Sequence, residues 1–189
     1  IKEDDIKPLL IQGKEVGLTA RDGNSGLEAF MQALRQDQNQ LESIENIALK
    51  NAISPQNNVP QDQVLGFLRE TLADAIREKN SAHHYDTIRE IVDSLKPLSS
   101  DPQFPQIQQL KQEENNATLN NLFANYVAAD HNCPLDPYCL DLLATSLGVP
   151  LTLVNLNGEE LRSNEMEGER PLTLVQSGSY FGYLKPFRN

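Results

Sequence analysis

The spacing of apolar residues changes near residue 135, and this change limits the chain to folds that combine helices with a sheet. Before it, apolar residues recur at i, i+3, i+4 and i+7 through long polar segments, which is typical of helices with one buried face. After it, residues 149–156 are apolar and β-branched, and Asn157-Gly158 is a strong hairpin-turn signal. Helices first and strands later predict an α+β fold, with one small C-terminal sheet flanked by helices.

The same periodicities predict where the individual elements lie. Helices are expected at 25–34, 41–52, 61–79, 85–95, 106–114, 117–129 and 135–147. Strands are expected at 149–156, 171–175 and 180–184, and Ser177-Gly178 joins the last two. The segment 99–104 carries prolines and serines and predicts a loop.

Charge and length exclude several classes of protein. The 189 residues include 27 acidic and 16 basic side chains, a formal net charge of −11, so we expect repulsion from phosphate backbones and no nucleic-acid partner. No apolar run approaches the ~20 residues that span a bilayer, so we expect no membrane insertion. Neither glycine-rich nucleotide motif occurs, and we expect no cofactor. Because the chain starts at Ile1 and not at Met, we expect a fragment or a trimmed chain.

The two cysteines lie close together in the segment 131–139. A zinc site takes four ligands, and His131, Cys133 and Cys139 supply only three, so we expect no metal site. Two cysteines are also too few for a scaffold held together by disulfides. We therefore expect a reduced cytoplasmic protein with Cys139 packed on a helix face.

The segment 19–30 contains the residues that best suit a chemical role. Asp22-Gly23-Asn24 is a turn-forming triplet that places Ser25 at the N-terminus of an amphipathic helix. Backbone amides and the helix dipole at such an end stabilise an anion, which suits a nucleophile and a tetrahedral oxyanion. A serine that only caps the helix after a turn has the same local sequence. Both interpretations stay open at this point.

The same segment resembles part of the ovarian-tumour (OTU) family of deubiquitinases. Asp22-Gly23-Asn24-Ser25, followed by Leu27 and Phe30, is similar to the family's Asp-Gly-Asn-Cys element, in which the cysteine is the nucleophile. The run from 140 to 155 is similar to the family's late helix and the strand that follows it. Residues 171–175 and 178–181 are similar to its last strands, which surround a Gly-His-Tyr-Asn/Asp element.

This resemblance implies an architecture and a partner. It implies an OTU-like, papain-related core in a single domain over 1–189, with 37–125 as a helical insertion or arm. The implied partner is ubiquitin or a ubiquitin-like protein, whose C-terminal tail lies in a channel between the nucleophile loop and the last strands in the family. The residues that would line the equivalent groove are Asp22, Gly23, Asn24, Ser25, Gly178, Ser179 and Tyr180.

Three positions depart from the family pattern. Ser25 stands at the nucleophile position and Ser179 at the general-base histidine, and Asp22 completes the set of catalytic-site positions. Phe181 stands where the family has the Asn or Asp that orients the histidine. A cysteine protease needs a thiolate, an imidazole and an orienting group. The resemblance therefore implies a pseudoenzyme, because a Cys-to-Ser change made in the laboratory would account for Ser25 alone.

Two other functions remain as alternatives. An active OTU cysteine protease captured as a Cys-to-Ser variant predicts that the native residue 25 is Cys and that a histidine reaches it. His83 and His84 are interpreted as a solvated pair at a helix start, and His131 follows Asp130 in a loop. The other alternative is a helical adaptor whose Gln/Asn-rich middle recruits a protein. A helical insertion of this composition suits a bacterial effector in the host cytosol, or a viral or eukaryotic protein.

Overall fold

The structure is a computed structural model, and it describes residues 10–20, 22–129, 134–167 and 170–185. The chain divides into two compact units. Unit 1 combines 1–65 with 132–189, and unit 2 is 66–131. Sequence analysis placed a helical insertion at 37–125, whereas residues 37–65 belong to the unit that holds the sheet.

Unit 1 is built on a sheet that has six strands within the described residues. The strand order is β1-β2-β6-β5-β3-β4, and the β3–β5 pair is parallel while the other neighbours are antiparallel. The strands are β1 (Leu10–Ile11), β2 (Lys14–Gly17), β3 (Leu151–Val154), β4 (Glu160–Ser163), β5 (Leu172–Ser177) and β6 (Tyr180–Leu184). The predicted α+β class and the C-terminal strands are confirmed. The N-terminal strands β1 and β2 were not predicted, because two and four residues carry too little of the alternating pattern.

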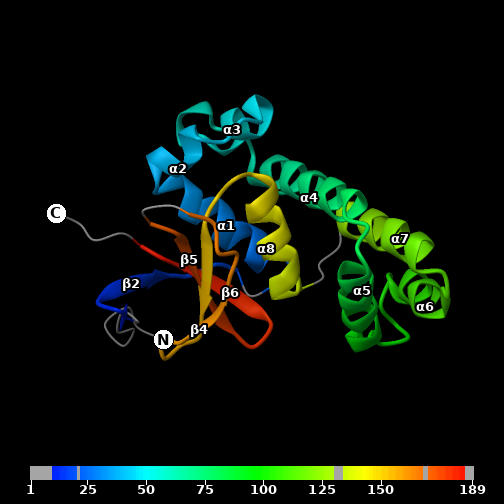
Figure 1. The fold of residues 1–189 in the computed structure, drawn as a ribbon. Helices are drawn as coiled ribbons and strands as arrows, with labels where there is room; N and C mark the ends of the chain where they lie inside the picture. Colours follow the sequence, from blue (N-terminus) through cyan, green and yellow to red (C-terminus); the bar gives the residue numbers. More distant parts are fainter. Residues whose placement is uncertain (1–9, 21, 130–133, 168–169, 186–189) are drawn as a thin grey trace. The chain divides into compact units, whose positions relative to one another are not determined.

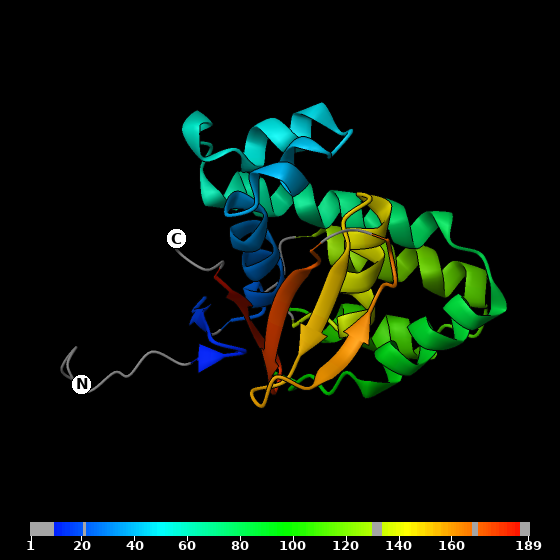
Figure 2. The same ribbon diagram turned by 60° about the vertical axis from the view of Figure 1, so that its left-hand side comes forward.

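Two helices cover one face of this sheet, as Figures 1 and 2 show. Helix α1 (Ser25–Arg35) begins at the residue that the sequence predicted, and its apolar stripe of Leu27, Phe30, Met31 and Leu34 is fully buried. Helix α8 (Pro137–Ser146) begins after Asp136, whose side chain accepts a hydrogen bond from the backbone N–H of Tyr138. Proline in the first turn and an aspartate cap explain this start.

The opposite face of the sheet carries a second apolar cluster. Its members are Ile11, Val16, Val154, Val175 and Leu184, all less than a tenth exposed. The sheet curls over this cluster, because the turn after β1 meets the turn after β3: the Gln12 side-chain amide donates to the Gly158 carbonyl at 3.3 Å. A Cβ atom on Gly158 would lie 3.2 Å from Ile11, so a glycine there permits the close approach.

The single helix predicted at 41–52 is wrong. The structure has α2 (Gln38–Glu42), α3 (Ile47–Ile53) and a short 3₁₀ helix, η2 (Pro55–Asn57). The break has a local cause: the Asn46 side chain accepts a hydrogen bond from the Leu49 backbone N–H at 3.1 Å and starts a new helix. The apolar residues on both sides of the break are buried, which explains why their spacing suggested one helix.

Unit 2 is helical throughout its described residues. Helix α4 (Gln61–Glu78) crosses the boundary between the units, and α5 (Ala82–Ser94), α6 (Phe104–Gln112) and α7 (Asn116–Ala128) follow. The four helices predicted here are confirmed to within a few residues. The loop predicted at 99–104 is also confirmed, since α6 starts only at Phe104.

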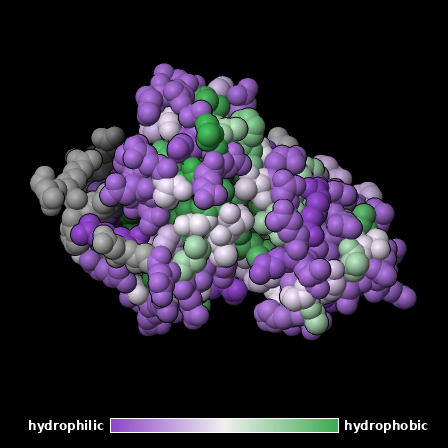
Figure 3. All heavy atoms as spheres, turned by 45° about the horizontal axis from the view of Figure 1, so that its top comes forward, coloured by the Kyte–Doolittle hydropathy of each residue, from purple (hydrophilic) through white to green (hydrophobic). Residues whose placement is uncertain are grey.

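The polar character of the sequence carries over to the surface. The face drawn in Figure 3 is mostly hydrophilic, with smaller hydrophobic areas between the polar side chains. Within the described residues, no helix combines the length and the apolar character that a membrane crossing requires.

Candidate functional site

A tight turn delivers Ser25 to the start of α1. The Asp22 side chain accepts a hydrogen bond from the Asn24 backbone N–H at 2.9 Å, and the Asp22 carbonyl accepts one from the Ser25 N–H at 3.2 Å. Asn24 is the N-cap residue, and Ser25 is the first residue of the helix. The interpretation of Ser25 as a cap is therefore wrong, although the predicted turn and helix start are confirmed.

The Ser25 side chain is turned inward onto the sheet. Ser25 is only 1% exposed, and its Oγ accepts a hydrogen bond from the backbone N–H of Phe181 in β6 at 3.1 Å. The Thr19 hydroxyl donates to the Phe181 carbonyl at 2.6 Å. Both backbone groups of Phe181 are thus held by residues from the segment around the turn, so β6 and the start of α1 are tied together at this position.

Close packing beside Ser25 excludes further groups. Phe181 is 3% exposed, and a Cβ atom on Gly26 would lie 3.4 Å from its ring and 3.3 Å from Leu140 of α8. Gly26 therefore lets α1 approach both β6 and α8. The residue that meets Ser25 is an apolar ring rather than a proton acceptor.

The other predicted groove residues lie in the β5–β6 hairpin. Ser177 pairs with Tyr180, so Gly178 and Ser179 form a two-residue turn. Gly178 has φ of +61° and Ser179 does not have a positive φ, which is the pattern of a type II′ turn. Ser179 is exposed in this turn, and no hydrogen bond joins it to Ser25 within the described residues. Tyr180 is 40% exposed.

The predicted groove is acidic and contains no imidazole from its own unit. Burial raises the pKa of Glu28 on α1, the hydrogen bond from the Ala20 backbone N–H opposes this, and the nearby Asp22 carboxylate adds to the rise. The ranges of unit 1 contain no histidine at all, since all three histidines fall within 66–131. His131 and Asp130, which the alternative hypotheses used, lie outside the described residues.

The two remaining histidines have different environments. His83 is exposed, but His84 is 1% exposed and its ring Nε2 lies 2.8 Å from the Asn120 Oδ1 atom. The prediction of a solvated pair is therefore wrong for His84. Helix α5 starts three residues before the predicted 85, because Ser81 caps it, and this earlier start turns His84 into the unit.

The described residues contain no cluster of three or more metal-ligating side chains. Cys139 is fully buried on α8, which confirms the prediction for this cysteine, while Cys133 lies outside the described residues.

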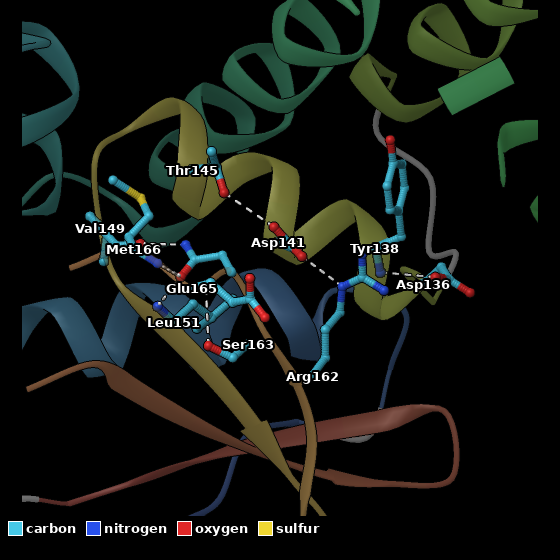
Figure 4. A network of polar contacts seen from close by, with 11 residues as sticks. Asp136, Tyr138, Asp141, Thr145, Val149, Leu151, Arg162, Ser163, Glu165 and Met166 are labelled. Atoms are coloured by element: carbon cyan, nitrogen blue, oxygen red, sulfur yellow. Dashed lines mark hydrogen bonds and ion pairs between the residues drawn. The ribbon is translucent and has the colours of Figure 1, made fainter. Parts of the chain in front are cut away.

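A second polar network, which the sequence analysis missed, joins α8 to β4 (Figure 4). Arg162 Nε lies 2.7 Å from the Asp141 carboxylate, which also accepts a hydrogen bond from the Thr145 hydroxyl at 3.1 Å. The Arg162 guanidinium lies 5.3 Å from the centre of the Tyr138 ring. Burial, with a contribution from Cys139, raises the pKa of Tyr138 to about 12 despite the opposing effect of Arg162. No spacing in the sequence links β4 to α8, so pattern reasoning had no signal for this network.

Next to it, one side chain joins the start of β3 to the end of β4. Asn164 accepts a hydrogen bond from the Leu151 N–H at 2.9 Å and donates to the Val149 carbonyl at 2.8 Å. Together the two networks hold the edge of the sheet against α8 and give this part of unit 1 a structural role.

Comparison with known proteins gives one similar structure. No family model matches the sequence, and a search of curated proteins finds no match. Among solved structures, the chain is similar to the crystal structure of the viral OTU domain protease from Farallon virus. The two are 15% identical with a TM-score of 0.48, over 90% of this chain and 83% of that chain.

Proposed function

We propose that the chain is an OTU-like domain without catalytic activity that binds ubiquitin or a ubiquitin-like protein. The support comes from the Asp22-Gly23-Asn24-Ser25 element and the late helix and strands, whose order along the chain resembles the OTU family. The turn before α1 and the β5–β6 hairpin both contribute to one site, because Thr19 and Ser25 bond the same residue of β6.

The loss of catalysis rests on one observation, the closed environment of Ser25. A nucleophile must reach its substrate and must have a base within hydrogen-bond distance. Ser25 is 1% exposed, its Oγ already accepts the Phe181 N–H, and Phe181 packs beside it. No residue in the ranges of unit 1 can serve as an imidazole base.

Binding would use the exposed part of the same site. Gly178, Ser179 and Tyr180 are exposed in the hairpin, and Asp22 and Asn24 are half-buried in the facing turn. An exposed tyrosine supplies a large apolar area with a polar tip, which suits a protein interface. The acidic groups beside the turn, Asp22 and Glu28, would favour a partner segment that carries basic side chains.

The binding test is a titration of the unlabelled full chain into isotope-labelled ubiquitin, followed by NMR. We expect shifts in the C-terminal tail of ubiquitin and on its hydrophobic face. Tyr180→Ala should weaken the interaction at least about fivefold, because Tyr180 is the exposed aromatic ring of the hairpin. Leu161→Ala is the control, since Leu161 is similarly exposed but lies on β4 at the other edge of the sheet. No shifts at several hundred micromolar would remove ubiquitin and favour the helical adaptor.

The catalytic alternative has its own test. Ser25→Cys is treated with ubiquitin that carries a C-terminal electrophile, and Ser25→Ala is the control. Without an activating imidazole, the buried thiol should remain unlabelled. Covalent labelling of Ser25→Cys would show that the site can act as a cysteine protease and would refute the pseudoenzyme proposal.

A further inference from the structure

The most completely buried titratable group among the described residues is a histidine in unit 2. His84 is 1% exposed, and it lies on the first turn of α5 after the Ser81 cap. Its ring Nε2 lies 2.8 Å from Oδ1 of Asn120 on α7, a residue that is itself 2% exposed. A buried histidine with a buried amide partner links these two helices.

The contacts of Asn120 decide which ring nitrogen carries the proton. The Asn120 side-chain nitrogen donates to the Ile76 carbonyl at 2.9 Å and to the Lys79 carbonyl at 3.3 Å, both at the C-terminal end of α4. The amide oxygen is therefore the atom that faces His84, and it can only accept. A neutral His84 with its proton on Nε2 fits this arrangement, because it donates one hydrogen bond and adds no buried charge.

A protonated ring would fit poorly in the same place. Burial lowers the pKa of His84; the Asn120 hydrogen bond and the Ile76 carbonyl oppose this, and the charges of Lys79 and His83 reinforce it. Helix α7 contributes no charged side chain, since its residues 116–128 are all uncharged. None of the groups that face the ring from α4, α5 or α7 is a carboxylate that would compensate a positive charge.

We propose that His84 and Asn120 form an acid-sensitive latch, in which protonation of the His84 ring releases α5 from α4 and α7. The latch holds three helices through one amide: Asn120 reaches α4 through two carbonyls and α5 through the His84 ring. Release would expose the apolar face of α5, which includes the buried Ile88, Ile91 and Val92. Unit 2 would then present a new apolar surface in a mildly acidic environment.

The pH range follows from linkage. A histidine whose pKa is lower in the folded state than its ordinary value of 6.5 binds its proton more tightly when unfolded. The closed form is therefore fully favoured above pH 6.5, and it loses stability as the pH falls from 6.5 toward the lowered value. Within that range, the equilibrium constant for opening rises by up to about tenfold for each pH unit.

The test is amide hydrogen exchange on the full chain at pH 7.5, 6.5 and 5.5. His84→Gln keeps a donor for Asn120 but cannot titrate. His83→Gln removes the neighbouring, exposed histidine and is the matched control. After correction for intrinsic exchange rates, the wild type and His83→Gln should lose protection in α5 and α7 below pH 6.5, whereas His84→Gln should keep it. Equal pH dependence in all three proteins, or equal loss in unit 1, would refute the latch.

An NMR titration of the histidine ring signals gives a result even where His84→Gln does not fold. The His83→Gln spectrum assigns the signals, and the wild-type protein is then titrated. We expect the His84 midpoint to lie below 6.5 and to coincide with the loss of protection in α5. A His84 midpoint at or above 6.5 would overturn the proposal.

Discussion

Unit 1 and unit 2 differ in how far along the chain their buried polar contacts reach. In unit 1, Ser25 and Phe181 are 156 residues apart, and Thr19 and Phe181 are 162 apart. In unit 2, His84 and Asn120 are 36 apart, and Asn120 and Ile76 are 44 apart. The site of unit 1 therefore depends on a sheet that joins distant segments, whereas that of unit 2 depends on neighbouring helices.

The two units also satisfy buried polar groups differently. The Ser25 hydroxyl binds a backbone N–H, so its environment depends mainly on where β6 runs. The His84 ring binds a side chain, so its environment depends on the identity of Asn120. Mutations should consequently disturb unit 1 through its backbone packing and unit 2 through its side-chain partners.

The largest effect should come from Gly17→Ala in unit 1. Gly17 pairs with Tyr183, and a Cβ atom at position 17 would lie 2.2–2.6 Å from the Tyr183 ring. The ring is 8% exposed and its hydroxyl lies 3.4 Å from Gln36, so it cannot move freely. We expect a loss of about 3 kcal/mol in the free energy of unfolding, measured by denaturant titration. Hydrogen exchange should localise the damage to β2 and β6.

Gly66→Ala is the matched control for that change. A Cβ atom at Gly66 has its nearest neighbour at 3.9 Å, and the residue lies within α4. Alanine should stabilise the helix by about 0.5–1 kcal/mol. Equal losses from both glycine variants would contradict the packing argument.

Asn120→Ala should give the next largest effect, this time in unit 2. The change leaves the Ile76 and Lys79 carbonyls and the His84 ring without their shared partner in a buried place. We expect a loss of about 2 kcal/mol, with hydrogen exchange increased in α4, α5 and α7 and unchanged in the sheet. The neighbouring, exposed Asn121→Ala should leave unfolding nearly unchanged. Damage that spread equally to the sheet would argue against two separable units.

Arg162→Ala tests the network between α8 and β4 and should have a smaller effect. The Asp141 and Arg162 side chains are 19% and 38% exposed, so the ion pair and the ring contact together should contribute about 1 kcal/mol. The exposed pair of Lys185 and Glu15, at 3.4 Å, offers a comparison. Lys185→Ala should change the unfolding free energy by less than about 0.5 kcal/mol.

The smallest effect, of opposite sign, should come from Glu28→Gln. Because burial raises the pKa of Glu28 above its ordinary 4.5, the ionised carboxylate destabilises the folded state at neutral pH. The amide keeps an acceptor for the Ala20 N–H and should stabilise unit 1 by roughly 0.2–0.5 kcal/mol at pH 7, a value reduced by solvent screening. The gain should disappear below pH 4, where the wild-type carboxyl is protonated. An equal gain from the exposed Glu70→Gln would remove the explanation.

Sequence reasoning predicted most helices and the C-terminal strands because each carries its own periodicity. It missed β1 and β2, which are short and gain their stability from pairing with β6. It also joined α2 to α3, since the Asn46 side chain and not the apolar spacing decides that boundary.

The candidate site was predicted only in part. The turn at 22–24 and the helix start at Ser25 follow from local turn chemistry, and both were predicted correctly. Which residue of β6 meets Ser25 depends on the register between distant segments, and the contact falls on Phe181 rather than on Ser179. The buried state of His84 was not predicted either, because it depends on a cap three residues upstream.

The pairing of β2 with β6 has a consequence for the order of folding during synthesis. Val16 pairs with Leu184, so the sheet remains open until nearly the whole described chain has left the ribosome. Unit 2 lies within 66–131 and is complete earlier. At a synthesis rate of about 5–20 residues per second, residues 132–184 take roughly 3–10 s to appear. During that delay the apolar stripe of α1 lacks its sheet, and a chaperone has time to bind it.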